Sequence, residues 1–298
     1  MKRLPMVAMT ALLALLALPS QALELLHSER SLYRQVLIYG EGDTRYLCFT
    51  RNCAIGRQST IDLKQPDRLL FDYTHMMMAS LFMGPAPRNV LIIGLGGGSL
   101  PRALAMTLPN AHIDAVEIDP AVTRVAKQYF RFTPGPDTTV IEEDGRTYVK
   151  RALRAGRHYD LIMLDAYDHE YIPEHLLTRE FLQEVKSLLE PNGVVAANTF
   201  SSSRLYDSES VTYRAVFGEF YNLKTANRVI LARNGPLPSL ADIERNSTAY
   251  ESAFTRLGFS VADVRGRFSV KADWNPSARV LTDQYSPANL WWSVPLGS

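Results

Sequence analysis

The sequence has little cysteine, no excess of charge of either sign and no long apolar run beyond its first residues. Of its 298 residues two are cysteine, and 32 Lys and Arg oppose 31 Asp and Glu, which gives a net charge of +1. Nucleic-acid-binding proteins normally carry a basic face, so this balance argues against DNA and RNA partners. With 46% hydrophobic and 21% charged residues, the composition excludes a disordered chain and favours a globular protein with a sizeable core.

The two cysteines are Cys48 and Cys53, with four residues between them. Such a pair can close a small disulfide loop in an oxidising compartment, and two buried thiols are the alternative. No second pair of Cys or His residues stands at the spacing of zinc ligands. The acidic and histidine residues between Asp165 and His175 also lack a recognised ligand spacing. We therefore expect no metal site.

The first 22 residues are typical of an export signal. Lys2 and Arg3 precede an apolar run from Val7 to Leu18, and small residues up to Ala22 suit cleavage. The run is shorter than the ~20 residues that a membrane span needs. We expect residues 1–22 to be a signal peptide and the mature protein to be periplasmic, with an uncleaved anchor in the inner membrane as the alternative.

The next part of the chain, residues 23–84, predicts a small β-rich segment followed by a helix. β-Forming residues flank a glycine-containing turn, which indicates a hairpin with strands over 33–39 and 45–49. Apolar residues then recur at helical spacing over 66–83, and a stretch of Gly and Pro ends that helix. We place the domain boundary there, with residues 85–298 as the second unit.

From residue 88 short apolar segments alternate with helical ones. Strands that alternate with helices form a parallel sheet covered on both faces, and ligands collect at the carboxyl ends of its strands. The pattern therefore predicts an α/β protein, although it becomes less regular from about residue 201. The expected strands are Val90–Ile93, His112–Val116, Thr139–Glu142, Leu161–Leu164, Val194–Asn198 and Val229–Ala232, and the helices include 120–130 and 178–189.

The first of these strands runs into a turn that contains Gly94, Gly96 and Gly98 and then into a helix. Glycine allows a tight turn and lets the backbone approach a ligand, and the start of the helix offers unpaired N–H groups. The next strand leads to Glu117, where a carboxylate can accept both ribose hydroxyls of a nucleoside. The two features together predict a nucleoside site, with a purely structural turn as the alternative.

Two further strands lead to carboxylates. Asp144 follows the third strand, where it could accept a hydrogen bond from the exocyclic amine of an adenine. Asp165 ends the fourth strand, and Asp168 follows three residues later. Paired carboxylates suit binding a cationic amine and taking its proton, and apolar surroundings raise their basicity. Roles as a strand end and as a loop or cap residue are the alternatives.

The order of these motifs resembles that of the spermidine synthases, or polyamine aminopropyltransferases, which share the Rossmann-like fold of S-adenosylmethionine methyltransferases. The resemblance covers about residues 31–200, and residues 281–287 resemble the ending of many such proteins. The matching positions are Tyr33–Leu37, Gln58, Phe71–Tyr73, Val90–Gly98, Val116–Asp119, Asp144–Gly145 and Tyr159–Asp168.

The resemblance implies transfer of an aminopropyl group from decarboxylated S-adenosylmethionine to an amine such as putrescine, without a metal. Asp165 would then be the proton acceptor. The residues that would bind the amine are Tyr73, Asp168 and Gln58. The residues that would hold the adenosyl donor are Gly94, Gly96, Gly98, Glu117, Asp144 and Gly145. A homodimer or homotetramer is also implied.

Three positions depart from the family pattern. Gly97 stands where the family has an aspartate that faces the donor's ammonium and would repel the carboxylate of ordinary S-adenosylmethionine. Arg34 and His75 replace a glutamine and a glutamate, which removes features suited to a dicationic amine. For His75 a packed, hydrogen-bonded role is the alternative to titration at the site. Two other functions stay open: a methyltransferase that uses S-adenosylmethionine, and a non-catalytic exported protein that binds a nucleoside or polyamine.

Overall fold

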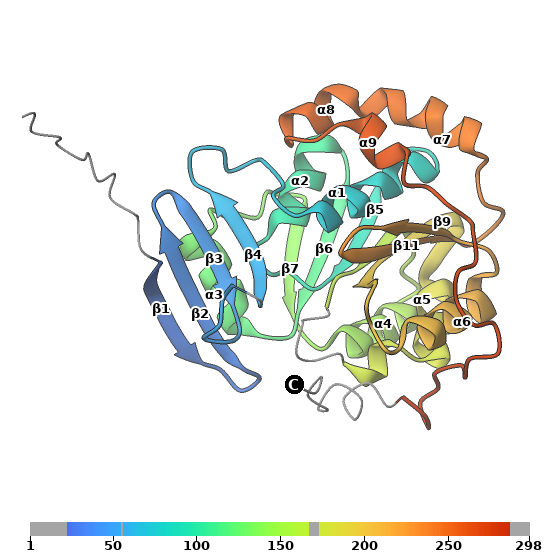
Figure 1. Cartoon of the computed structure of the whole chain (residues 1–298), viewed down its shortest axis with the longest axis horizontal. Coiled ribbons are helices and arrows are strands. Elements are labelled where there is room, and N and C mark those ends of the chain that lie inside the picture. The colour runs from blue at the N-terminus through green and yellow to red at the C-terminus, as the bar shows by residue number, and fades with distance from the viewer. Residues whose placement is uncertain (1–22, 55, 167–172, 287–298) are drawn as a thin grey trace, which may run out of the picture.

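The computed structural model describes residues 23–54, 56–166 and 173–286 (Figure 1). The expected signal peptide, residues 1–22, and the predicted site residue Asp168 lie outside the described residues. Within them the chain forms a small four-stranded sheet and a large seven-stranded sheet with helices on both faces. Among the helices of these ranges, none has the length and apolar character needed to cross a membrane.

The small sheet contains the first four strands in the order β1-β2-β3-β4, each antiparallel to the next. Its strands are β1 (Glu24–Arg30), β2 (Gln35–Glu41), β3 (Thr44–Cys48) and β4 (Arg57–Asp62). The expected hairpin is confirmed as β2 and β3. Gly42 has a φ of 57° in its tight turn, a conformation that glycine adopts readily.

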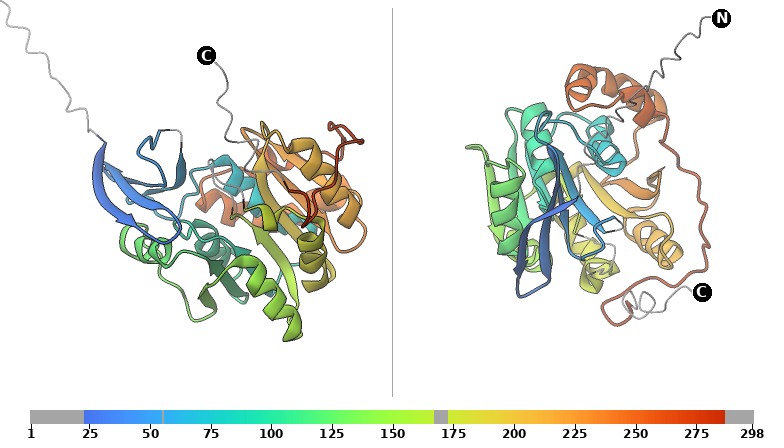
Figure 2. Two further views of the ribbon diagram at one scale, coloured as in Figure 1. Left: turned by 90° about the horizontal axis from the view of Figure 1, so that it is seen from below. Right: turned by 60° about the vertical axis from the view of Figure 1, so that its left-hand side comes forward.

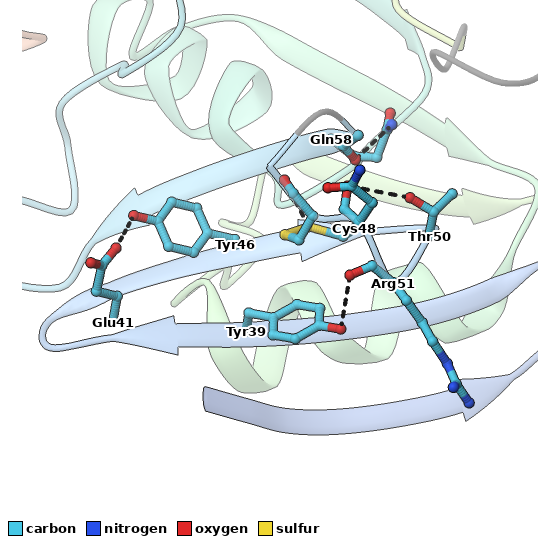
Figure 3. The surroundings of a disulfide bond; sticks show 10 residues. Tyr39, Glu41, Tyr46, Cys48, Thr50, Arg51 and Gln58 are labelled. Carbon is cyan, nitrogen blue, oxygen red and sulfur yellow. Dashed lines mark hydrogen bonds between the residues drawn. A yellow bond between two sulfur atoms is a disulfide. The ribbon is translucent and has the colours of Figure 1, made fainter. Parts of the chain in front are cut away.

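A disulfide between Cys48 and Cys53 closes the loop that joins β3 to β4 (Figure 3). Both cysteines are buried, and the Tyr39 hydroxyl donates to the Arg51 carbonyl oxygen of the same loop at 3.4 Å. Of the two states open from the sequence, the disulfide is therefore the one in this structure. The loop leads directly into β4, which carries Gln58 (Figure 3).

The large sheet has the strand order β10-β11-β9-β8-β5-β6-β7. Its members from β5 to β9 are parallel, while β11 and β10 return antiparallel at one edge. The strands are β5 (Asn89–Ile93), β6 (His112–Glu117), β7 (Thr138–Glu142), β8 (Tyr159–Leu164), β9 (Leu189–Phe200), β10 (Tyr221–Lys224) and β11 (Asn227–Arg233). The predicted α/β class and all of the predicted strands are confirmed, and β10 is additional.

Helices cover both faces of the large sheet because its buried strands carry apolar residues in both directions. In β5, Val90 and Ile92 face one core, and Leu91 and Ile93 face the other. The first core is covered by α1 (Asp72–Met78), α2 (Ser99–Thr107), α7 (Leu240–Ser247), α8 (Glu251–Arg256) and α9 (Val261–Arg265) (Figure 1). The second is covered by α4 (Gly145–Arg154), α5 (Arg179–Leu188) and α6 (Tyr206–Phe217).

Helix α3 (Pro120–Tyr129) joins the two sheets (Figure 2). Val122 and Val125 pack in one buried cluster with residues of β2, β3 and β4. Ala126 packs with Ala115 of β6 in another cluster. The small sheet is therefore held against the rim of the large one, which brings β4 to the carboxyl ends of the parallel strands.

The segment over 66–83 is helical only from Asp72, so the predicted start of this helix was wrong by six residues. Phe71 has an extended backbone, and the N–H of Leu69 donates to the carbonyl oxygen of Leu257 at 2.9 Å. This contact with the C-terminal helices takes the place of a first helical turn. After α1 the chain continues as a 3-10 helix over Ala79–Met83.

The C-terminal third, expected to be less regular, contains the helices α6 to α9 together with β10 and β11. This third also contains a short 3-10 helix at Thr248–Tyr250, and another lies earlier in the chain at Glu174–Leu176. Leu69, α1 and the 3-10 helix over Ala79–Met83 pack in one core with α7, α8 and α9, so this segment is covered by helices that the sequence pattern did not reveal.

Candidate active site

A cavity of about 810 Å³ lies at the carboxyl ends of the parallel strands, between the large sheet, β4 and α1. Its volume is in the range of small-molecule sites, roughly 300–1,000 Å³. The lining contains these predicted site residues: Gln58, Tyr73, Gly94, Gly96, Glu117, Asp144, Gly145 and Asp165. Residues that are far apart in sequence therefore meet at the predicted rim of the sheet.

The glycine turn after β5 passes directly behind the end of β8. Gly94 has a φ of 104°, and a Cβ placed on it would lie 2.2 Å from the backbone oxygen of Asp165. Only glycine fits this approach without a shift of the backbone. Gly96 lines the cavity, whereas Gly98 precedes α2 and is covered by the ring of Phe132. The turn thus places Asp165 beside the nucleoside-binding backbone that the sequence predicts.

Glu117 ends β6 at the buried floor of the cavity. One of its carboxylate oxygens accepts a hydrogen bond from the backbone N–H of Leu95 and the other accepts one from Asp119, both at 3.0 Å. Burial nevertheless raises the pKa of Glu117 above its usual value. The two backbone bonds hold the carboxylate in one orientation and leave each oxygen a lone pair for a ligand.

Asp144 caps the N-terminus of α4, where its Oδ1 accepts a hydrogen bond from the N–H of Thr147 at 2.9 Å. Its Oδ2 lies 2.8 Å from Nε2 of His175. This contact lowers the pKa of Asp144 to about 2, so the carboxylate is ionised at neutral pH. Gly145 follows, and a Cβ on it would lie 2.5 Å from the side chain of Ile93.

Asp165 follows β8 and lies at the centre of the site. Its Oδ1 accepts a hydrogen bond from Nδ2 of Asn198 at 2.9 Å, and its Oδ2 accepts one from the Tyr73 hydroxyl at 3.3 Å. Removal from water raises the pKa of Asp165 to about 7 in spite of these bonds, and the charge of Glu117 adds to the rise. A carboxyl group with this pKa can take a proton near neutral pH.

The amine end of the predicted site lies between α1 and the small sheet. Tyr73 reaches Asp165 from α1, and Gln58 lines the cavity while its Nε2 donates to the Gly56 carbonyl oxygen at 3.2 Å. Arg34 also lines the cavity, with its guanidinium 4.4 Å from the centre of the Phe49 ring. The departure at position 34 therefore lies where it can affect the substrate.

Gly97 lies at a position of the glycine turn that is covered by the side chains of Ser59 and Phe130. Its backbone N–H donates to the hydroxyl of Ser59 at 2.8 Å, and an added Cβ would lie 2.7 Å from the ring of Phe130 and 3.0 Å from Cβ of Ser59. A side chain at this position needs a shift of its neighbours. The aspartate of the family pattern is therefore absent here, and its side chain would not fit at position 97 unless Ser59 and Phe130 moved.

His75 points away from the cavity. Its ring stacks on Phe259 with 4.2 Å between the ring centres, and its Nε2 lies 2.8 Å from the carbonyl oxygen of Leu69. Burial lowers its pKa. It borders a separate hollow of about 960 Å³ on the other side of α1. The packed role is thus the one observed, and the departure at position 75 does not alter the site.

Sequence reasoning missed Asn198 and Asn227, which both line the cavity. Asn198 is the last residue of a predicted parallel strand. This position could have predicted that its side chain lies at the rim that binds the ligand. Asn227 carried no such signal because β11 runs antiparallel and brings its first residue, not its last, to this rim. Within the described ranges no group of three or more His, Cys, Asp or Glu side chains could hold a metal ion.

Comparison with other proteins identifies relatives over nearly the whole chain. The model of the spermine/spermidine synthase domain matches residues 70–227. A polyamine aminopropyltransferase from Vibrio vulnificus is 45% identical over 294 residues, which cover 96% of this chain and 98% of that protein.

Solved structures share the fold. A probable spermidine synthase from Corynebacterium glutamicum has a TM-score of 0.63 at 17% identity and covers 85% of this chain and 97% of its own. Human methyltransferase-like protein 13 in complex with SAH has a TM-score of 0.56 at 28% identity and covers 62% of this chain and 93% of its own.

The fold and the rim cavity define a protein of the Rossmann-like methyltransferase class with a small N-terminal antiparallel sheet. The similarity in sequence is more specific than the fold. The chain belongs to the spermine/spermidine synthase family.

Proposed function

We propose that this protein transfers an aminopropyl group from decarboxylated S-adenosylmethionine to an amine such as putrescine. The observation that carries the proposal is the place of Asp165, a carboxyl group with a pKa of about 7 directly beside the glycine turn. The family relationship supports the same reaction, because the relative from Vibrio vulnificus is a polyamine aminopropyltransferase.

The residues present fit an adenosyl donor. Glu117 would accept the ribose hydroxyls, since each of its oxygens keeps a free lone pair. Asp144 would accept from the adenine amine, and Gly94 and Gly96 line the cavity, so the backbone of the turn is accessible to the donor. The donor supplies a carbon that is activated by a positively charged sulfur.

The chemistry requires an amine with a free lone pair in line with that carbon. The amine nitrogen forms a bond to the methylene carbon, the bond from this carbon to sulfur breaks, and its electron pair stays on sulfur in a neutral thioether. Asp165 takes a proton from the ammonium group of the substrate before the attack, which frees the lone pair of its nitrogen, and the product nitrogen keeps the positive charge as a secondary ammonium group. Tyr73 and Asn198 hold the two carboxylate oxygens so that this base faces the reacting nitrogen.

The first test is product formation from decarboxylated S-adenosylmethionine and putrescine, followed by mass spectrometry. Asp165→Asn is expected to lower kcat by at least about 100-fold, because general bases typically contribute that much or more. Donor binding, measured by calorimetry, should stay nearly unchanged. Asp137→Asn, at an exposed position outside the cavity, is the matched control and should keep full activity. Absence of product from the unmodified protein with any diamine would refute the proposal.

A methyltransferase that uses S-adenosylmethionine is the second candidate, favoured by the closed position of Gly97. Without an aspartate there, nothing at this position repels the donor's carboxylate. Calorimetry with both donors separates the candidates, because tighter binding of the carboxylated donor would favour methyl transfer. Binding of both ligands without any product would instead support a non-catalytic binding protein.

We also propose that residues 1–22 direct export and that the mature protein is periplasmic and oligomeric. The Cys48–Cys53 disulfide supports an oxidising compartment. Mass spectrometry of protein from its native host would report the mature N-terminus and the state of both cysteines. Light scattering after gel filtration would report whether it is a dimer or tetramer. An intact N-terminus in a membrane fraction would favour the uncleaved anchor.

A further inference from the structure

Two asparagines form a chain of hydrogen bonds that ends on Asp165. Nδ2 of Asn227 donates to Oδ1 of Asn198 at 3.1 Å, and Nδ2 of Asn198 donates to Oδ1 of Asp165 at 2.9 Å. All of these side chains line the same cavity. Asn198 is 4% exposed and Asn227 is half-buried, so the amide of Asn198 is largely shielded from bulk water.

The topology of the sheet creates this chain. Ala197 of β9 pairs with Leu164 of β8, which places the next residue of each strand, Asn198 and Asp165, side by side. On the other side Asn198 pairs with Val229 of β11. Asn227 lies two residues before Val229 and therefore on the same face of the sheet, as a diagonal neighbour of Asn198.

The order of donors and acceptors fixes the direction of the chain. An ionised carboxylate only accepts hydrogen bonds, so the Asn198 amide must turn its NH₂ group toward Asp165. Its oxygen then faces Asn227, which presents an NH₂ group. If the Asn198 amide turned over, two oxygen atoms would face each other at Asp165. Asn227 thus has a reason to be an amide although it does not touch the carboxylate.

Resting on the aminopropyl transfer proposed above, we infer that Asn198 is a positioning residue for Asp165 and that Asn227 acts through it by fixing which end of the Asn198 amide faces the base. The pair holds Oδ1 of Asp165 in place, so that Oδ2 and the Tyr73 hydroxyl face the reacting amine.

Other charged groups around Asp165 must be kept constant in any test. Glu117 faces it from β6 and Tyr73 from α1. Among the described residues, the other ionisable side chains that line the cavity are Tyr33, Arg34, Arg57, Asp72, Asp144 and His175. None of these is altered by a change at Asn198 or Asn227. A shift in the titration of Asp165 in those variants therefore reports the amide chain.

The experiment compares the pH dependence of kcat in Asn198→Ala, Asn227→Ala and the double variant. Loss of the Asn198 bond removes a donor that favours the ionised carboxylate, so the acid limb should move up by about one pH unit. For a base with a pKa of about 7, this shift lowers the rate about fivefold at pH 7 and little at pH 9. Asn227→Ala should give a smaller shift in the same direction.

The double variant tests whether Asn227 acts through Asn198. In that case the double variant should match Asn198→Ala alone, because Asn227 has nothing left to orient. Asn222→Ala is the matched control: Asn222 is a 3% exposed amide of β10 that bonds the Tyr206 hydroxyl at 3.0 Å. A variant that only loses packing should have a lower kcat at every pH and an unshifted acid limb. Asn222→Ala is expected to behave in this way. If Asn198→Ala does not fold, Asn227→Ala at the half-buried rim still tests the inference.

A titration followed by NMR separates failure of this inference from failure of the proposed reaction. Aspartate labelled with ¹³C at the carboxyl carbon reports each pKa directly, and the signal missing in Asp165→Asn identifies Asp165. The same upward shifts are expected even if no amine yields product. An unchanged Asp165 titration in Asn198→Ala, or an Asn227→Ala shift that persists in the Asn198→Ala background, would overturn the inference.

Discussion

At the scale of single residues, the raised pKa of Asp165 suits the proposed reaction but lowers the free energy of unfolding at neutral and higher pH. Its carboxyl group has a pKa of about 7, because burial of the side chain disfavours the charged form and the negative charge of Glu117 adds to the rise. In the unfolded chain an aspartate has a pKa of about 3.9. Between these values the folded protein binds more protons than the unfolded one, so the free energy of unfolding falls as pH rises through that window.

Asp165→Asn is therefore expected to stabilise the protein while it lowers kcat. The amide does not titrate, so at pH 8 the variant should exceed the unmodified protein by about 2 kcal/mol, a value reduced for the partial exposure of the site. The difference should shrink as the pH is lowered toward 5. Urea denaturation at both pH values measures it, with Asp137→Asn as a control that should show no such trend. Equal stability of variant and parent at pH 8 would contradict the raised pKa.

The residues that the sequence revealed are those at the ends of parallel strands. Glu117 and Asp165 could be placed at one rim because a parallel sheet brings the carboxyl ends of its strands together. The sequence could not show that Ser59 and Phe130 close over Gly97, because both contacts depend on how the small sheet and α3 pack.

At the scale of structural elements, the turn between β5 and α2 depends on the close approach at Gly94. Gly156, after α4, also has a positive φ but has open space where a Cβ would be. Gly156→Ala should cost about 1 kcal/mol from backbone strain alone. Gly94→Ala should cost more, because the Cβ meets the backbone of Asp165, and it should weaken donor binding at least tenfold. Thermal unfolding and calorimetry measure the two effects, and equal losses in both variants would argue against the clash.

The disulfide in the loop between β3 and β4 is expected to stabilise the folded protein. This bond restricts the unfolded chain, and for a loop this short the contribution is about 2 kcal/mol. Reductant should lower the urea midpoint of the unmodified protein accordingly, whereas a Cys48→Ala/Cys53→Ala variant should start lower and not respond to reductant. If the reductant is shown to break the bond and the urea midpoint of the unmodified protein does not change, the disulfide does not contribute to stability.

Elements with a simple apolar pattern were predictable, and those defined by distant contacts were not. The strands β5 to β9 and the helices α3 and α5 carry enough periodic apolar residues to be found one at a time. The true start of α1 was hidden, since Leu69 pairs with Leu257 in a helical region that lies far along the chain. β10 is short and exists only through its pairing with β11.

At the scale of the whole molecule, Arg146 ties the C-terminal segment to the rim of the site. Its guanidinium bonds both carboxylate oxygens of Glu184 in α5, at 2.8 and 2.9 Å, and both of Asp283, at 2.7 and 2.8 Å. It also donates to the carbonyl oxygen of His175, the residue whose ring contacts Asp144. One side chain thus connects two helices, the end of the described chain and the predicted adenine end of the cavity.

Arg146→Ala is expected to affect both stability and donor binding. Removing the cation leaves Glu184 and Asp283 facing each other in a partly buried place, which should cost about 3 kcal/mol of unfolding free energy. His175 loses its anchor, so donor affinity should fall as well. Arg151→Ala is the matched control on the same helix, because its pair with Glu143 is half-exposed and should contribute less than about 1 kcal/mol. Urea denaturation and calorimetry of the two variants measure both effects, and an Arg146→Ala protein as stable as Arg151→Ala would show that the C-terminal segment is held by its apolar contacts instead.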